Sequence, residues 1–139
     1  MIQFFSENEF KISDETKYEK WVSDIIESEG FSEGEISYVF CDDDYLLKLN
    51  KDYLDHDTLT DIITFNYNMG KQINSDIYIS TERLADNAKD FHVSFEDELR
   101  RVMSHGILHL CGLNDKTPQE EETMREKENE KMKMFHVEQ

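Results

Sequence analysis

Four short segments of the chain combine β-branched and aromatic residues in the way that is typical of strands. They are IQFF (2–5), EISYVFC (35–41), DIITFNY (61–67) and SDIYIS (75–80). Strands this short do not bury their apolar side chains alone, so they are expected to pair in one small sheet that other elements cover. The order of the strands stays open at this point.

Helical signals lie between the strand segments. Ser13 is placed to cap a helix that ends before Gly30. The apolar residues of this helix recur with the helical period: Tyr18, Trp21, Val22, Ile25 and Ile26. The aspartates at 42–44 lack the alternating ligands, the glycine and the distal glutamate of a calcium loop, so we expect them to cap a second helix.

The second half of the chain carries three further helix starts. A polar helix is expected over residues 81–90, and Ser94-Phe95-Glu96-Asp97 resembles a capping box that opens a longer helix. Thr117-Pro118-Gln119-Glu120 combines an N-cap, a first-turn proline and a glutamate at the third helical position. The charged end of that last helix is expected to fray. These elements predict a single α+β domain over residues 1–139, with a small sheet of about four strands covered by helices.

The charge balance limits the function classes. With 15 Lys and Arg against 32 Asp and Glu, the net charge is -17, which opposes non-specific attraction to nucleic acid. Any nucleic-acid role must therefore rest on a local site. No apolar run approaches the roughly 20 residues of a membrane helix, and the N-terminus lacks signal-peptide features, so we expect a cytoplasmic location without a membrane partner. Cys41 and Cys111 lack CxxC spacing and suit reduced thiols.

The segment SHGILHLCGLND (104–115) holds two histidines one helical turn apart. In a helix that begins near Phe95, the apolar stripe consists of Leu99, Val102, Met103, Gly106 and Leu110. His105 and His109 lie together on the flank of that stripe, where both imidazoles can point at one spot. By itself, such a pair is more often a surface pair or a satisfied pair than a metal site.

Residues after the histidine pair favour a metal site. Gly112 is placed where a left-handed residue stops a helix, and the turn there could bring Asp115 back toward the two rings. His105, His109 and Asp115 are then the predicted ligands. Asn114 competes with Asp115, but a neutral amide is the poorer ligand, and Cys111 is assigned to the core.

The spacing His-x3-His-x2-Gly-x2-ligand matches that of metzincin zinc peptidases, with two differences. Gly106 replaces the glutamate that acts as general base, which disfavours peptide hydrolysis. Asp115 replaces the third histidine, and its charge makes the metal a weaker Lewis acid than three imidazoles would. The expected cofactor is one Zn²⁺ ion, although the same ligands suit iron or manganese.

Two blocks of the sequence resemble the YbeY family of bacterial endoribonucleases and rRNA maturation factors. SHGILHLCGLND resembles the family signature HGxLHLxGxxH, and LNKDYLDHDTLTDIITF (49–65) followed by SDIYIS resembles LNxxYRxxDxxTDVLSF and GDI. The likeness spans roughly residues 35 to 118. The positions in register are His105, Gly106, Leu108, His109, Leu110, Gly112, Asn50, Tyr53, Asp57, Thr60, Asp61, Phe65 and Asp76.

The resemblance implies an α+β metal-hydrolase-like fold, a bound zinc or similar ion, and cleavage of single-stranded RNA in small-subunit rRNA maturation and ribosome biogenesis. Its implied partners are rRNA and the ribosomal small subunit or its proteins. In this interpretation the three metal ligands are also the catalytic residues, acting through the ion. The predicted substrate-binding residues are His56, Thr60, Asp61 and Arg101.

Several alternatives remain open. Thr60 and Asp61 could equally form a turn that opens a strand, and Arg100 as well as Arg101 could meet phosphates. Leu54 stands where the family commonly has an arginine that would hold a phosphate. His56, Lys51 and Lys48 are nearby substitutes. The competing functions are a non-catalytic, metal-stabilised ribosome-assembly factor and a metal hydrolase of another substrate.

Overall fold

The computed structural model describes residues 1–54 and 59–136, and within these ranges it has four strands and five helices. The strands are β1 (Ile2–Ser6), β2 (Ser32–Cys41), β3 (Ile62–Asn66) and β4 (Gln72–Ser80). The helices are α1 (Glu15–Ser28), α2 (Asp43–Leu54), α3 (Thr81–Phe91), α4 (Phe95–Leu110) and α5 (Pro118–Phe135). The predicted α+β class and all four strand segments are confirmed. In the part of the chain described, no helix is both long and apolar enough to cross a membrane.

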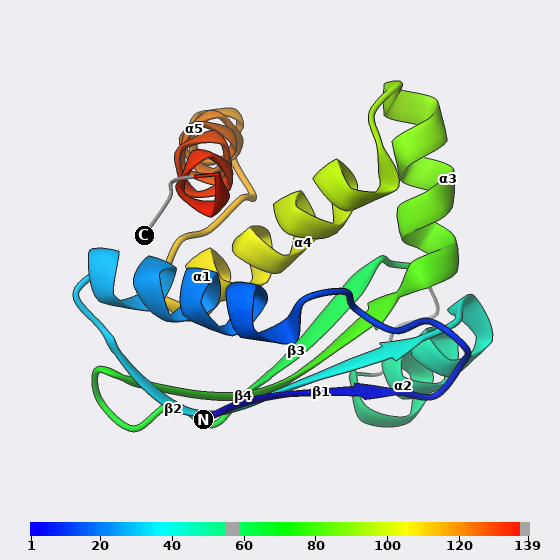
Figure 1. Ribbon diagram of the computed structural model, residues 1–139, viewed down its shortest axis with the longest axis horizontal. Coiled ribbons are helices and arrows are strands. Elements are labelled where there is room, and N and C mark those ends of the chain that lie inside the picture. The colour runs from blue at the N-terminus through cyan, green and yellow to red at the C-terminus, as the bar shows by residue number, and fades with distance from the viewer. Residues whose placement is uncertain (55–58, 137–139) are drawn as a thin grey trace.

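The strands form one mixed sheet in the order β1-β2-β4-β3. β1 and β4 pair with β2 in parallel, whereas β3 runs antiparallel to β4 and forms an edge of the sheet. β2 begins earlier than predicted because Ser32 and Glu33 pair with β4 across a register shift, a contact between distant segments. In Figure 1, α1, α3, α4 and α5 lie on one side of the sheet and α2 lies on the other.

The main core lies between the sheet and the helices above it. It includes Val22, Ile25 and Ile26 of α1, Ile36, Tyr38 and Phe40 of β2, Ile77 and Ile79 of β4, and Met103 and Ile107 of α4. A second, smaller cluster beneath α2 contains Cys41, Leu46 and Ile63. Adjacent β3 residues alternate between the two faces, so Ile62 packs against the main core and Ile63 packs beneath α2.

Helix α4 approaches the edge strand β3 closely. Its predicted apolar stripe is buried: Leu99, Val102, Met103, Gly106 and Leu110. A Cβ added at Gly106 would lie 2.8 Å from Cδ1 of Ile62, so a larger residue here requires Ile62 to move. This close approach places the histidine flank of α4 along β3.

Two predicted helix ends differ from the structure. The N-cap of α1 is Asp14, not Ser13, and its side chain accepts a hydrogen bond from the Lys17 amide while its backbone is left-handed (φ 56°). Aspartate tolerates that conformation and is a strong N-cap. The capping box of Thr117 and Glu120 is confirmed in full, whereas at Ser94 the structure has the bond from the Asp97 amide to the serine side chain.

The last helix extends to Phe135 and one side of α5 is buried, while the end of the tail, residues 137–139, lies outside the described residues. The buried residues are Met124, Glu128, Lys131 and Phe135. The Lys131 ammonium lies 2.8 Å from a Glu29 oxygen, and the Trp21 indole donates to the Lys131 carbonyl at 2.7 Å. The Phe135 ring contacts Tyr18 and Trp21. These contacts hold α5 against α1 and position Glu128.

Both cysteines are free thiols, Cys41 buried and Cys111 half-buried against the main core. Burial, chiefly, raises the pKa of Cys41 to about 12 and that of Cys111 to about 11. Both thiols are therefore protonated at neutral pH, and the assignment of Cys111 to the core agrees with the structure.

Candidate metal and substrate pocket

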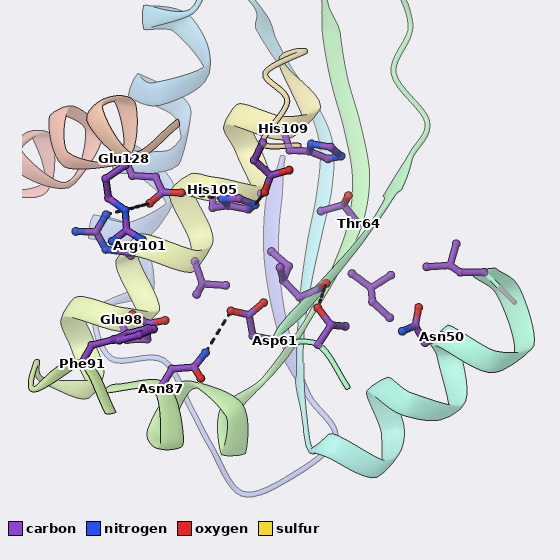
Figure 2. Close-up of a pocket in the computed structure, with 18 residues that line it drawn as sticks. Asn50, Asp61, Thr64, Asn87, Phe91, Glu98, Arg101, His105, His109 and Glu128 are labelled. Atoms are coloured by element: carbon purple, nitrogen blue, oxygen red, sulfur yellow. Dashed lines mark hydrogen bonds and ion pairs between the residues drawn. The ribbon is translucent and has the colours of Figure 1, made fainter. Parts of the chain in front are cut away.

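A pocket of about 710 Å³ lies along the β3 edge, lined by residues of α2, α3, α4, α5 and β3 (Figure 2). Its volume falls in the range of small-ligand sites. Six predicted site residues line it: His105, His109, Asp115, Thr60, Asp61 and Arg101. The seventh, His56, lies outside the described residues. The structure thus brings together predicted residues from two separate blocks of the sequence.

His105 is held from both sides of its ring. Its Nδ1 lies 2.7 Å from Oε2 of Glu128, and its Nε2 lies 3.4 Å from Oδ2 of Asp115. The bond to Glu128 raises the pKa of His105 and outweighs the opposing effect of burial. Burial pushes the pKa of Glu128 up, but hydrogen bonds from His105 and Arg101 outweigh it, so that pKa lies below its ordinary value. A carboxylate on Nδ1 is the usual support of a metal-binding histidine, because it directs Nε2 toward the ion.

His109 has a similar support but a different direction. Its Nδ1 lies 3.2 Å from the Leu113 carbonyl, in the turn that Gly112 makes with φ 100°. The predicted left-handed stop at Gly112 is therefore confirmed. If Nδ1 donates to that carbonyl, Nε2 carries the lone pair that binds metals. Figure 2 shows the His109 ring directed away from His105.

The donor atoms of the three predicted ligands suit a divalent ion, but the three side chains do not all converge on one point. Two imidazoles, each with Nδ1 held by an oxygen, and one carboxylate form a donor set that zinc, iron or manganese accepts. His105 and Asp115 are already in contact, whereas His109 is turned aside. Within residues 1–54 and 59–136, no three or more His, Cys, Asp or Glu side chains converge as a metal site.

Two carboxyl groups also line the pocket, those of the half-buried Asp61 and the buried Glu98, and the sequence reasoning identified one of them. Asp61 was predicted, whereas Glu98 and Asn87 were not. The Asn87 amide donates to Oδ2 of Asp61 at 3.4 Å (Figure 2). Burial raises the pKa of Asp61, and burial together with the nearby Asp61 raises the pKa of Glu98. Both carboxyl groups therefore hold a proton more readily than exposed ones do.

Thr60 and Leu54 also face the pocket. The Thr60 hydroxyl donates to the Ile62 carbonyl at 3.3 Å, which agrees with a turn that opens a strand, and the residue lines the pocket as well. The two alternatives for Thr60 therefore coexist. Leu54, at the end of α2, places an apolar side chain on the same wall.

The two neighbouring arginines of α4 have separate surroundings. Arg100 is buried, where it bonds Asp97 and the Tyr18 hydroxyl and lies over the Phe135 ring, so the suggestion that it meets phosphates is wrong. Arg101 lines the pocket, but it donates to Oε1 of Glu128 and to Asn129, both at 2.9 Å. The two side chains differ in exposure because Arg100 points toward Tyr18 of α1, whereas Arg101 points toward Glu128 and Asn129 of α5.

The sequence contained a partial signal for one of the missed residues. Glu98 precedes His105 by seven residues, two helical turns, which places both on one side of α4. Glu128 and Arg125 gave no such signal, because they belong to a highly charged last helix in which no residue stood out from its neighbours. Their place in the pocket depends on the packing of α5 against α1 and α4.

The fold and pocket define a class of small α+β proteins in which a histidine-bearing helix and the acidic loop after it line a pocket at the antiparallel edge of a sheet. The family model described as Endoribonuclease YbeY matches residues 3–136. The chain belongs to this family, as its two sequence blocks predicted.

Relatives named Endoribonuclease YbeY support the assignment over the whole chain. Those of Flavobacterium psychrophilum and Flavobacterium johnsoniae are each 58% identical over 139 residues, covering 100% of this chain and 99% and 100% of theirs. That of Christiangramia forsetii is 54% identical over 138 residues, covering 99% of this chain and 96% of its own. The solution structure of TM1509 from Thermotoga maritima matches with a TM-score of 0.68 at 24% identity, covering 97% of this chain and 89% of that one. This structural match concerns the fold.

Proposed function

We propose that the protein is a metal-dependent, single-strand-specific endoribonuclease that acts in the cytoplasm in small-subunit rRNA maturation and ribosome biogenesis. The observation that carries the proposal is His105, supported on Nδ1 by Glu128 and facing Asp115 through Nε2, in a pocket of about 710 Å³. The name of the relatives at 58% identity, Endoribonuclease YbeY, supports RNA as the substrate.

His105, His109 and Asp115 would hold the ion, with Zn²⁺ as the first candidate and another divalent transition metal as the second. When bound, such an ion supplies Lewis acidity toward the phosphodiester and lowers the pKa of a coordinated water. Glu128 keeps the His105 ring in place, and Arg101 in turn keeps Glu128 ionised and oriented. The protein thus supplies a positioned ligand set in a partly enclosed pocket.

The carboxyl groups of Asp61 and Glu98 supply protons in this proposal. A raised pKa gives Asp61 and Glu98 a larger share of the protonated form, which can donate to the leaving oxygen of the cleaved strand. The Asn87 amide orients Asp61 toward the pocket. Single strands suit such a pocket, because unpaired nucleotides can splay into it and paired ones cannot.

The acidic surface bears on the proposed partners. A net charge of -17 repels nucleic acid in general, so RNA is bound only where the pocket provides local contacts. The same charge complements the basic proteins of the ribosomal small subunit. The proposal therefore includes the small subunit or its proteins as the partner that brings the enzyme to rRNA.

Cleavage assays with matched variants test the proposal. The native protein, His105→Ala, His109→Ala and the control His136→Ala are purified in parallel, stripped with a chelator and reloaded with Zn²⁺. Native protein and His136→Ala should cut a single-stranded RNA and spare its duplex, whereas the two pocket variants should lose most of the activity and the bound zinc. Native protein that leaves the RNA intact with every divalent metal tested would contradict an endoribonuclease.

The orientation of His109 favours a second candidate, a non-catalytic assembly factor in which the metal only stiffens the loop after Gly112. In that case native protein would bind the ribosomal small subunit without cutting RNA, and His109→Ala would harm folding or that association without removing any cleavage activity. The same variants thus distinguish the two functions.

A further inference from the structure

We propose that Arg125 of α5 is the residue that binds a phosphate of the RNA strand in the pocket. This inference rests on the proposed function, because it concerns the same pocket and the same substrate. Neither the histidine motif nor the LTDIITF block contains Arg125.

The pocket requires a cation beyond its histidines. Its lining carries four carboxyl groups, those of Asp61, Glu98, Asp115 and Glu128, and each of them repels a phosphodiester strand whenever it is ionised. A guanidinium matches phosphate with two parallel hydrogen bonds and keeps its charge at every physiological pH. Among the described residues, the arginines or lysines that line the pocket are Arg101 and Arg125.

Arg101 is already occupied within the protein. Its two terminal nitrogens donate to Glu128 and Asn129, each at 2.9 Å, and its side chain is 24% exposed. A phosphate that captured Arg101 would break the contact that keeps Glu128 in place beside His105. Arg101 therefore acts on the substrate through Glu128 as a positioning residue.

Arg125, unlike Arg101, is largely exposed and makes no close contact with Glu128. Its side chain is 61% exposed, and its Nε lies 3.9 Å from Oε1 of Glu128, which is too long for a hydrogen bond. That oxygen already accepts from Arg101. Because Arg125 is largely exposed and its contact with the buried Glu128 is long, that contact contributes little to folding, so the guanidinium can turn to a ligand at small cost.

Arg125 is also close to the proposed reaction centre. It and His105 approach different oxygens of one carboxylate, since Glu128 faces His105 with Oε2 and Arg125 with Oε1. Arg125 and His105 both line the pocket, so the Arg125 side chain can reach a phosphate that is bound there. Leu54 at the end of α2 provides no charge to the same pocket, so the cation comes from α5.

RNA binding by matched variants tests this assignment. The probes are a fluorescent six-nucleotide single strand for binding in chelator, where cleavage is suppressed, and the same RNA for cleavage with Zn²⁺. The variants are Arg125→Gln, Arg125→Lys and the control Lys133→Gln, which removes the same charge from an exposed position of α5 outside the pocket lining. Thermal unfolding checks that all three fold.

Arg125→Gln should weaken binding about tenfold, as expected for one charged hydrogen-bonded contact. It should also reduce the slope of log affinity against log salt by about 0.7, the value for one phosphate on a single strand. Arg125→Lys should keep the slope and recover part of the affinity, because it restores the charge without the paired donors. Lys133→Gln should match the native protein.

The outcomes separate this inference from the proposed function. If native protein cuts and binds RNA and Arg125→Gln does so with the same affinity, salt slope and kcat/KM, the assignment of Arg125 is wrong and the endoribonuclease stands. An equal loss in Lys133→Gln would also overturn it, since the effect would then belong to net charge. If native protein neither binds nor cuts RNA, the proposed function and this inference fail together.

Discussion

At the scale of single residues, the Glu128 carboxylate connects most of the pocket. One oxygen accepts from His105, the other accepts from Arg101, and the side chain is 6% exposed. Burying a carboxylate is costly unless charged partners surround it. Here the imidazole and the guanidinium meet that cost, so the orientation of His105 depends on a residue 23 positions later in the chain.

Replacing Glu128 by glutamine should lower zinc affinity about 10- to 100-fold, the usual effect of losing the carboxylate behind a metal-binding histidine. The amide keeps the shape of the side chain, so the fold should survive. Competition with a chromogenic chelator measures the affinity, and Glu126→Gln on the exposed side of α5 is the control. Unchanged zinc affinity in Glu128→Gln would show that His105 does not bind the metal.

At the scale of secondary-structure elements, the packing of α5 against α1 decides whether Glu128 and Arg125 line the pocket. Lys131 is almost fully buried, and its ammonium contacts Glu29 at 2.8 Å and the Ser28 hydroxyl at 2.9 Å. Trp21 and Phe135 complete the contact. The helix that brings Glu128 and Arg125 to the pocket is thus held by contacts on the same buried side that carries Glu128.

Lys131→Ala should destabilise the protein by about 3 kcal/mol, because it leaves the half-buried Glu29 with fewer partners and opens a gap beside Trp21. Lys133→Ala, on the exposed side, should change stability by less than about 0.5 kcal/mol. Urea unfolding measures both. A similar small effect in the two variants would mean that α5 is held by its apolar residues alone.

The same contact predicts a pH dependence. Burial raises the pKa of Glu29, but hydrogen bonds from Lys131 and Lys127 outweigh it, so its folded pKa lies below the ordinary 4.5. A lowered folded pKa means that the stabilisation is complete above the unfolded value and is lost as the pH falls through the folded value. The stability difference between native protein and Glu29→Gln should therefore shrink between about pH 6 and about pH 3. A difference that stays constant over this interval would contradict the ion pair.

At the scale of the whole molecule, the protein is strongly acidic although its proposed substrate, RNA, is itself a polyanion. The net charge of -17 opposes RNA over most of the surface, while the pocket brings Arg101, Arg125 and two histidines to one place. Recognition is then local, and few phosphates are neutralised. Under the proposed function, this arrangement would limit the enzyme to strands that enter the pocket or are delivered by a basic partner.

Binding of a short single strand should accordingly show a shallow salt dependence, with a slope of log affinity against log salt between about -0.7 and about -1.5, equivalent to one or two phosphate contacts. A duplex of equal length should bind at least about tenfold more weakly. Fluorescence anisotropy at several salt concentrations measures both. A slope steeper than about -3 would indicate a broad basic surface that the charge distribution does not provide.

Local chemistry was enough to predict the four strands, the apolar stripe of α4 and the turn at Gly112. Periodicity, capping and glycine conformation act over a few residues, so they can be read along the chain. The family was identified differently, from the resemblance of two sequence blocks, and that resemblance also pointed to Thr60 and Asp61. These two residues line one pocket together with His105, His109, Asp115 and Arg101. Their roles as metal ligands or substrate contacts stay predictions.

Only the tertiary structure decided which distant residues complete that pocket. Glu128 and Arg125 enter it because Lys131 and Phe135 are buried against α1, and the charged composition of α5 concealed that packing. Long-range packing likewise buried Arg100 and left Arg125 exposed. Burial and charge pairing depend on what folds beside a residue, and that neighbour can lie anywhere in the chain.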